Sequence, residues 1–284
     1  MVDNNTPATG ALPVTVLEPG RHEGAYWREL WRYRELFYFL AWRDILVRYK
    51  QTAFGVAWAL LQPLLTMAVF TIVFGRLAKL PSEGVPYPIL VFAALLPWQF
   101  FAAAVTNGAN SLVSNANLVS KVYFPRLIVP SASVIPGLVD FAISLGFLAL
   151  LIAWFGAWPD WRVFTLPLFL LLAAATGLGA AYWLAALTVK YRDFRYVVSF
   201  LLQAGLFISP VGFSSAIVPE SLRTLYSINP LVGVIDGFRW ALLGPGSPGL
   251  HTTGLALSAV LAVALLASGI RYFRATEKTF ADVI

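Results

Sequence analysis

The stretch RDILVRYKQTAFGVAWALLQPLLTMAVFTIVFG, residues 43–75, decides the fold class of this chain. A basic segment with Arg43, Arg48 and Lys50 runs without a linker into an apolar run at 54–75. About 20 apolar residues in a helix are enough to cross the hydrocarbon core of a bilayer. The sequence therefore predicts a first membrane span at 54–75, preceded by a charged segment at one face of the membrane.

The composition of the whole chain agrees with a membrane location. Of its 284 residues, 59% are hydrophobic and 12% are charged, whereas about 25% of the residues of a soluble domain are charged. We therefore expect an integral membrane protein. The net charge of +6 does not indicate a nucleic-acid partner, because the basic residues fall in short clusters beside apolar runs. The chain has no cysteine, which excludes disulfides and thiolate metal sites.

Six apolar runs of about 20 residues predict an all-α membrane protein with six transmembrane helices. They lie at 54–75, 88–106, 128–156, 163–188, 196–213 and 253–273, and Pro210 and Gly212 interrupt the fifth near its end. Lysine and arginine accumulate on the cytoplasmic side of membrane proteins. Fifteen of them lie on one predicted side, and five on the other: Arg76, Lys79, Arg162, Arg223 and Arg239. Both termini are therefore expected in the cytoplasm.

The segments outside the spans have distinct patterns. Residues 1–24 are polar and lack an apolar signal segment, so we expect a flexible cytoplasmic tail. Residues 25–53 repeat apolar groups at helical spacing, which predicts an amphipathic interfacial helix that either anchors the chain only or also docks a cytoplasmic partner. Within 214–243, Pro219 and Asn229-Pro230 begin two short helices. The apolar run LVGVI that follows favours a re-entrant helical hairpin over an ordinary surface loop.

Residues that carry catalysis or ion coupling are scarce in this sequence. Both histidines lie outside the predicted spans, and no HExxH pair, DxD pair or GxxxxGK[ST] phosphate loop occurs. We expect no catalytic group, no metal site and no cofactor in this chain. Asp140 is the only acid in the middle of a predicted span. An acid there costs about 2.5–3.5 kcal/mol on insertion scales, so we expect a buried structural acid with a hydrogen-bonding partner rather than a proton or cation site.

A six-span protein without its own energy source is expected to be a transport pore that another protein drives. Aromatic faces in such a pore can stack on the apolar faces of sugar rings, although most aromatic residues in membrane proteins serve packing and the interface. The candidates for the channel or its gate are Trp58, Gln62, Trp98, Phe100 and Phe101.

Five strings of the sequence resemble permease subunits of type-2 ABC exporters for polysaccharides, a family that includes O-antigen, capsule and teichoic acid exporters. They are RDILVRYKQTAFGVAWALLQPLLTM at 43–67, PYPILVFAALLPWQFF at 86–101, SLVSNANLVSKVYFPRLIVP at 111–130, VKYRDFRYVVSFLLQAGLFISPVGF at 189–213 and YSINPLVGVIDGFRWALLG at 226–244. The resemblance extends over about residues 25–275. It implies a six-helix permease domain at 54–284 in the bacterial inner membrane.

The same resemblance implies partners and a substrate. The permease would form a homodimer, bound to two copies of a separate cytoplasmic ATPase that uses ATP and Mg. The substrate would be a lipid-linked polysaccharide, O-antigen first, with capsular polysaccharide or teichoic acid as the alternative. Two other classes stay open, namely a membrane-embedded transferase that acts on lipid-linked sugar and a secondary transporter, for which Asp140 alone is insufficient.

The resemblance also implies roles for particular residues. The loop at about 113–126 corresponds to the coupling helix that meets the ATPase, with Asn117, Leu118, Lys121, Tyr123, Phe124, Pro125 and Arg126. A short helix that ends in Phe-Pro-Arg is expected to insert an aromatic knob into a cleft of the ATPase. Arg43, Arg48 and Lys50 would meet the diphosphate-lipid end of the substrate, contact the ATPase, or only hold the first span at its depth.

Overall fold

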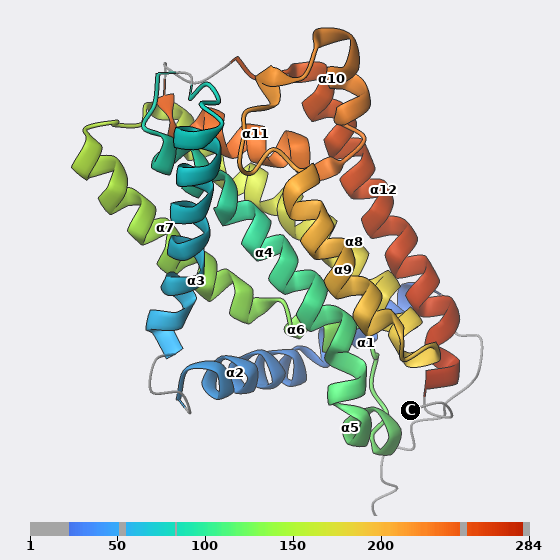
Figure 1. Ribbon diagram of the computed structural model, residues 1–284. Coiled ribbons are helices and arrows are strands. Elements are labelled where there is room, and N and C mark those ends of the chain that lie inside the picture. The colour runs from blue at the N-terminus through green and yellow to red at the C-terminus, as the bar shows by residue number, and fades with distance from the viewer. Residues whose placement is uncertain (1–22, 51–54, 83, 245–248, 281–284) are drawn as a thin grey trace, which may run out of the picture.

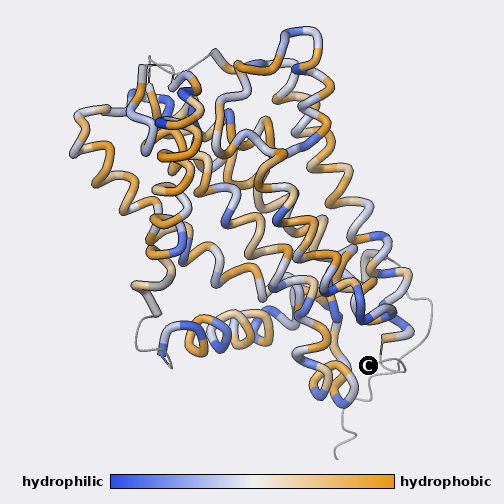
Figure 2. Tube along the Cα trace, in the orientation of Figure 1, coloured by the Kyte–Doolittle hydropathy of each residue, from blue (hydrophilic) through white to orange (hydrophobic). Residues whose placement is uncertain are grey.

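The computed structural model describes residues 23–50, 55–82, 84–244 and 249–280. Within these ranges every regular element is a helix, as the sequence predicts. Long helices stand side by side, and shorter ones lie at the two ends of the bundle (Figure 1). Figure 2 shows apolar residues along the long helices and hydrophilic ones mainly near their ends.

Five helical stretches in the described ranges are long and apolar enough to cross a membrane. The first joins α3 (Gly55–Phe70) to a π-helix (Thr71–Leu77), and the second is α4 (Tyr87–Ser114). The third combines α6 (Ile128–Ala132) with α7 (Ile135–Phe155). The fourth combines a 3-10 turn (Trp161–Thr165) with α8 (Leu166–Lys190). The fifth is α12 (Thr252–Thr276) with a 3-10 turn (Glu277–Thr279).

The run at 196–213, expected as a full span, forms a shorter helix. Helix α9 (Phe194–Ile208) has 15 residues, or about 22 Å at 1.5 Å per residue. It ends at Ile208, and the next residue, Ser209, has an extended backbone with ψ 153°. Because a proline disfavours helical backbone in the residue before it, Pro210 accounts for this early end.

Helix α4 lies at the centre of the bundle, between α3, α7, α8, α9 and α11 (Figure 1). In the most apolar 18-residue segment of α4, 72% of the residues are buried. In the corresponding segments of the other four spanning stretches, 11–33% are buried. The outer helices therefore turn large apolar side chains outward. Trp154 at the end of α7, for example, is 86% exposed, which suits a lipid-facing surface.

Helices α8 and α12 approach closely along their length. A Cβ atom on Gly179 would lie 2.6 Å from the backbone nitrogen of Leu266, and one on Gly269 would lie 2.4 Å from the carbonyl oxygen of Gly179. Glycine lets two membrane helices meet at this distance. Trp183 stacks on Tyr272 with ring centroids 4.0 Å apart, which adds a second contact between the same two helices.

The segment expected as one helix at 25–53 forms two helices, α1 (Glu23–Arg32) and α2 (Arg34–Lys50). Tyr33 separates the two. Helix α1 packs near the end of α12, and α2 lies across the ends of the long helices (Figure 1). One side of α2 buries Leu40 and Ala41, and aromatic residues on the other are at least half exposed: Tyr38, Phe39 and Trp42. Most of the predicted tail, residues 1–22, lies outside the described part, as do residues 51–53.

Two short helices follow α9 at the end of the bundle opposite α2 (Figure 1). They are α10 (Glu220–Tyr226) and α11 (Pro230–Leu242). The side chain of Asn229 accepts a hydrogen bond from the backbone amide of Leu231 at 3.1 Å, so the predicted N-cap is confirmed. The LVGVI run is buried in α11 against α4, α8 and α12, whereas α10 has no buried residue.

Candidate functional site

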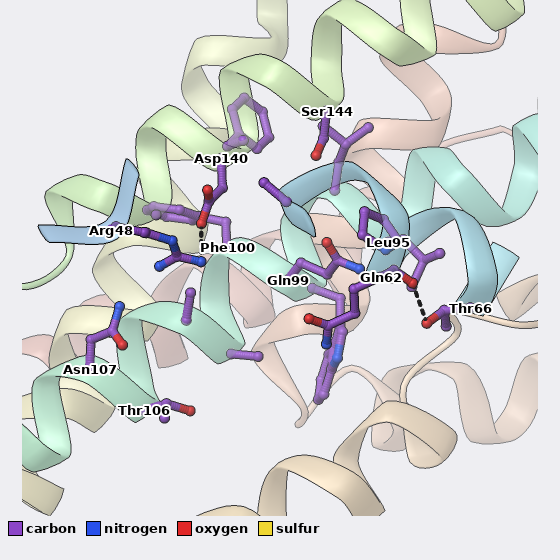
Figure 3. A pocket seen from close by; sticks show the side chains of 18 of the residues that line it. Arg48, Gln62, Thr66, Leu95, Gln99, Phe100, Thr106, Asn107, Asp140 and Ser144 are labelled. Atoms are coloured by element: carbon purple, nitrogen blue, oxygen red, sulfur yellow. Dashed lines mark hydrogen bonds and ion pairs between the residues drawn. The ribbon is translucent and has the colours of Figure 1, made fainter. Parts of the chain in front are cut away.

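A cavity of about 840 Å³ lies between α3, α4, α7 and the last turns of α2 (Figure 3). Its size falls within the range of about 300–1,000 Å³ that is typical of pockets for small organic ligands. Trp98 and Phe100 contribute aromatic rings to the wall. The polar lining residues are Arg48, Gln62, Thr66, Gln99, Thr106, Asn107, Asp140 and Ser144.

The cavity arises from a small-and-polar stripe on each of the three spanning helices. On α4 the stripe comprises Gln99, Ala102, Ala103, Thr106 and Asn107, which recur at the spacing of one helix face. The matching stripe on α3 comprises Ala59, Gln62, Pro63 and Thr66. The stripe on α7 comprises Gly137, Asp140 and Ser144. Small residues leave room between the helices, and the polar ones face the space so formed.

The residues predicted for the channel or gate divide into three groups. Gln62, Trp98 and Phe100 line the cavity. Phe101 is not among its lining residues, because it packs beside Trp98 with ring centroids 5.7 Å apart and contributes to other apolar clusters. Trp58 belongs to α3, but its side chain lies outside the described part of the chain. Five polar lining residues were not predicted, although their helical spacing within apolar runs indicated them: Thr66, Gln99, Thr106, Asn107 and Ser144.

Asp140 has an ionic partner in addition to a hydrogen-bonding one. A guanidinium nitrogen of Arg48 lies 2.5 Å from its Oδ2 atom (Figure 3), and the Tyr49 hydroxyl donates to its Oδ1 atom. Consecutive residues of α2 thus bind both carboxylate oxygens. Burial, and then the hydrogen bond to Asp140, raises the pKa of Tyr49.

The three basic residues of the opening stretch have different surroundings. Arg48 is the one that lines the cavity. Arg43 forms an ion pair with its neighbour Asp44 at 2.7 Å, and Lys50 is exposed at the end of α2. The structure therefore does not gather these three side chains around one point of the cavity.

The coupling helix, expected at about 113–126, is shorter in the structure. Helix α4 continues to Ser114, and the next helix, α5, comprises only Ala116–Lys121. Asn117, Lys121 and Tyr123 are exposed, and Leu118 is half-buried. Phe124 is only 3% exposed and packs in a cluster with Leu40, Leu127 and Phe273, while Pro125 is buried beside it. Phe124 is therefore not placed as the expected knob, and the exposed aromatic ring belongs to Tyr123.

The coupling segment is joined to both ends of the described chain. Arg126 donates a hydrogen bond to the backbone carbonyl of Glu277, and the Tyr26 hydroxyl donates to the Glu277 carboxylate at 3.1 Å. The guanidinium of Arg274 lies 4.4 Å from the centre of the Tyr26 ring. Burial, and then the nearby Glu277 carboxylate, raises the pKa of Tyr26. Arg126 thus contacts the turn after α12 directly, and it is linked to α1 through Glu277.

Arg239 in α11 is a buried cation that the sequence analysis counted as an outer-loop charge. Its side chain is 2% exposed. It donates to the carbonyl oxygens of Leu90 at 3.1 Å, Val211 at 3.0 Å and Phe213 at 2.8 Å. It thereby joins α4 to the irregular turn after α9. An arginine within the apolar run of α11 was the available signal.

Comparisons with known proteins agree with this architecture. Residues 35–243, which include every residue that lines the cavity, match the family model described as ABC-2 type transporter. The O-antigen export system permease protein RfbA of Myxococcus xanthus is 32% identical over 260 residues, covering 90% of this chain and 98% of that protein. A protein of the same name from Klebsiella pneumoniae is 26% identical over 69% of this chain and 76% of its own length. The polysialic acid transport protein KpsM of Escherichia coli is 22% identical over 83% and 91%. This chain therefore belongs to the membrane-protein family of ABC-2 type transporters.

Proposed function

We propose that this chain is the permease subunit of an ATP-driven exporter that moves a lipid-linked polysaccharide, O-antigen in particular, across the bacterial inner membrane. The cavity carries the proposal, because amide, hydroxyl and aromatic side chains line one space along three spanning helices. Amides and hydroxyls exchange hydrogen bonds with sugar hydroxyls, and aromatic faces pack on sugar C–H groups. The 32% identity to an O-antigen export permease over 90% of this chain supports the substrate. The weaker 22% identity to KpsM supports capsular polysaccharide as the alternative.

The energy is supplied by another chain in this proposal. The sequence contains no phosphate loop, and the family pairs its permeases with an ABC ATPase. A homodimer of this permease would bind two ATPase copies, which hold ATP and Mg. The exposed Asn117, Lys121 and Tyr123 are suitable contacts, since they project from the end of the bundle that carries α2 and α5. Closure of the ATPase dimer would then move the spanning helices through packed contacts.

We also propose how the chain sits in the bilayer. The end with α2, α5 and the last turn of α12 faces the cytoplasm, because most lysines and arginines lie in the segments that meet there. Helix α2 lies in the interface with its exposed aromatic residues among the headgroups. Helix α9 is the inner part of a sixth crossing, and α10 with the buried α11 forms a re-entrant pair that fills the outer part.

The test is transport by a reconstituted complex. The permease is purified with the ATPase that binds it and placed in proteoliposomes whose outer leaflet carries a polyprenyl-diphosphate glycan. Glycan that becomes protected from an external glycosidase measures translocation, and we expect protection with ATP but not with a non-hydrolysable analogue. Chemical alteration of the glycan by the permease alone would support a transferase instead. Transport that survives ATP depletion and stops when a proton gradient collapses would support a secondary transporter.

A further inference from the structure

We propose that the cavity selects an uncharged, hydroxyl-rich glycan over a polyanionic one, and that the Arg48–Asp140 ion pair sets this selectivity. The inference rests on the proposed function and adds the chemical class of sugar to it. It separates neutral glycans from acidic ones. Polysialic acid is an acidic glycan, and it appears in the name of a relative that is 22% identical to this chain.

The first argument is the charge of the cavity wall. Among its described lining residues the charged side chains are Arg48 and Asp140, and they are joined at 2.5 Å. The formal charge of this wall is therefore zero. Pores that conduct anions are lined by an excess of Arg and Lys, and moving an anion out of water without such compensation is unfavourable. A glycan with a carboxylate in each repeat would meet that penalty at every step.

The second argument is the chemistry of the remaining wall. A carboxamide carries two N–H donors and one carbonyl acceptor without a charge. Figure 3 shows the carboxamides of Gln62 from α3 and Gln99 from α4 directed into the same space. Asn107 lies about two turns further along the same face of α4. Sugar hydroxyls both donate and accept hydrogen bonds, so these groups match a neutral sugar. Such contacts are also weak enough individually to let a long polymer move on.

The third argument is the position of the ion pair. The Arg48 side chain is 40% exposed and that of Asp140 is 17% exposed, and both lie on the cavity wall. A change of either charge would therefore act directly on the contents of the cavity. Because Arg48 comes from α2 and Asp140 from α7, the neutral wall depends on the contact between these two helices.

The experiment is a charge series in the reconstituted complex of permease and ATPase. Asp140→Asn leaves a wall of charge +1, Arg48→Gln a wall of −1, and the double variant a neutral wall. Two probes share one polyprenyl-diphosphate anchor: a mannose tetrasaccharide, and the same tetrasaccharide with one glucuronic acid. The concentration of each that half-maximally stimulates ATP hydrolysis is measured. Asp44→Asn is the matched control, because it also removes an acid that pairs with an arginine of α2 and does not line the cavity.

The wild type, the double variant and Asp44→Asn should bind the neutral probe about tenfold more tightly than the acidic one, because the carboxylate of the acidic probe loses hydration without a compensating positive charge on the wall. Asp140→Asn should remove most of that preference, and Arg48→Gln should widen it. Equal stimulation of the wild type by both probes would overturn the inference alone, and so would a double variant that no longer prefers the neutral probe. No stimulation by either probe would overturn the proposed function. The comparison of probes on the wild type does not depend on any variant folding.

Discussion

Replacing Gly179 by alanine should weaken the packing of α8 against α12. The added Cβ would lie 2.6 Å from the nitrogen and 2.8 Å from the Cα of Leu266, and 2.7 Å from the carbonyl carbon of Leu265. These are backbone atoms, so no side-chain rotation relieves the contact. Since carbon atoms normally pack about 3.5–4.0 Å apart, the two helices must separate by about 1 Å.

Two opposing effects decide the size of the change. Alanine in a helix is favoured over glycine by about 0.5–1 kcal/mol. Overpacking of a close-packed interface costs about 1–3 kcal/mol, and the separation also disturbs the Trp183–Tyr272 stack at 4.0 Å. We therefore expect a net destabilisation of about 1–2 kcal/mol. Gly146 in α7 is the matched control, since an added Cβ there meets no atom of the described chain within 4 Å.

Unfolding equilibria in mixed dodecylmaltoside and SDS micelles, followed by tryptophan fluorescence, compare the three proteins. Gly146→Ala should be neutral or more stable than wild type by up to about 1 kcal/mol, in line with helix propensity. Gly179→Ala should unfold at a lower SDS fraction. If both variants are equally stable, the close approach of α8 and α12 does not constrain position 179 and the reasoning is wrong.

Three further predictions concern the other sites. Arg239→Met should expose residues 209–213 to hydrogen exchange more than Arg239→Lys does, because three carbonyls lose charged hydrogen bonds worth about 1.5–3 kcal/mol each. Equal exchange in the two variants would show that these hydrogen bonds do not hold the turn after α9 in place. Tyr123→Ala should lower the glycan moved per ATP hydrolysed several-fold without changing the melting temperature, whereas Phe124→Ala should lose about 3–5 kcal/mol of stability; the reverse pattern would restore Phe124 as the ATPase contact. Single cysteines at Ser82 and Asn117 should react with an impermeant maleimide from the outside and the inside respectively, and labelling from one side would refute the orientation.

The spanning helices could be predicted because hydropathy and length are local properties. The early end of α9 was also local, since Pro210 stands in the sequence and Ser209 takes the extended backbone that proline favours. The cavity was harder to foresee. The mean hydropathy of an apolar run does not reveal a stripe of Gln, Thr and Asn within it, because most of the neighbouring residues are alanine, leucine or phenylalanine. A test of these runs for polar residues at helical spacing would have indicated which faces of α3 and α4 line a space.

Contacts between distant segments could not be predicted from one sequence. Tyr123 and Phe124 are adjacent aromatic residues, and nothing local says which one is exposed. The answer depends on Leu40 and Phe273, which bury Phe124 from two other helices. The partner of Asp140 was equally hidden, because Arg48 is one of many arginines and only the path of α2 across α7 selects it.

The short α9 has a consequence for the surrounding lipid. Its length of about 22 Å is less than the hydrocarbon thickness of about 30 Å, and it presents Tyr196, Phe200 and Phe207 outward. Acyl chains beside this helix must shorten or tilt, at a cost of fractions of a kcal/mol for each ångström of mismatch. The buried α11 that completes this crossing offers little surface to lipid, so the bilayer should thin on this side of the molecule. The stability of the protein should consequently fall as the acyl chains of the host membrane lengthen.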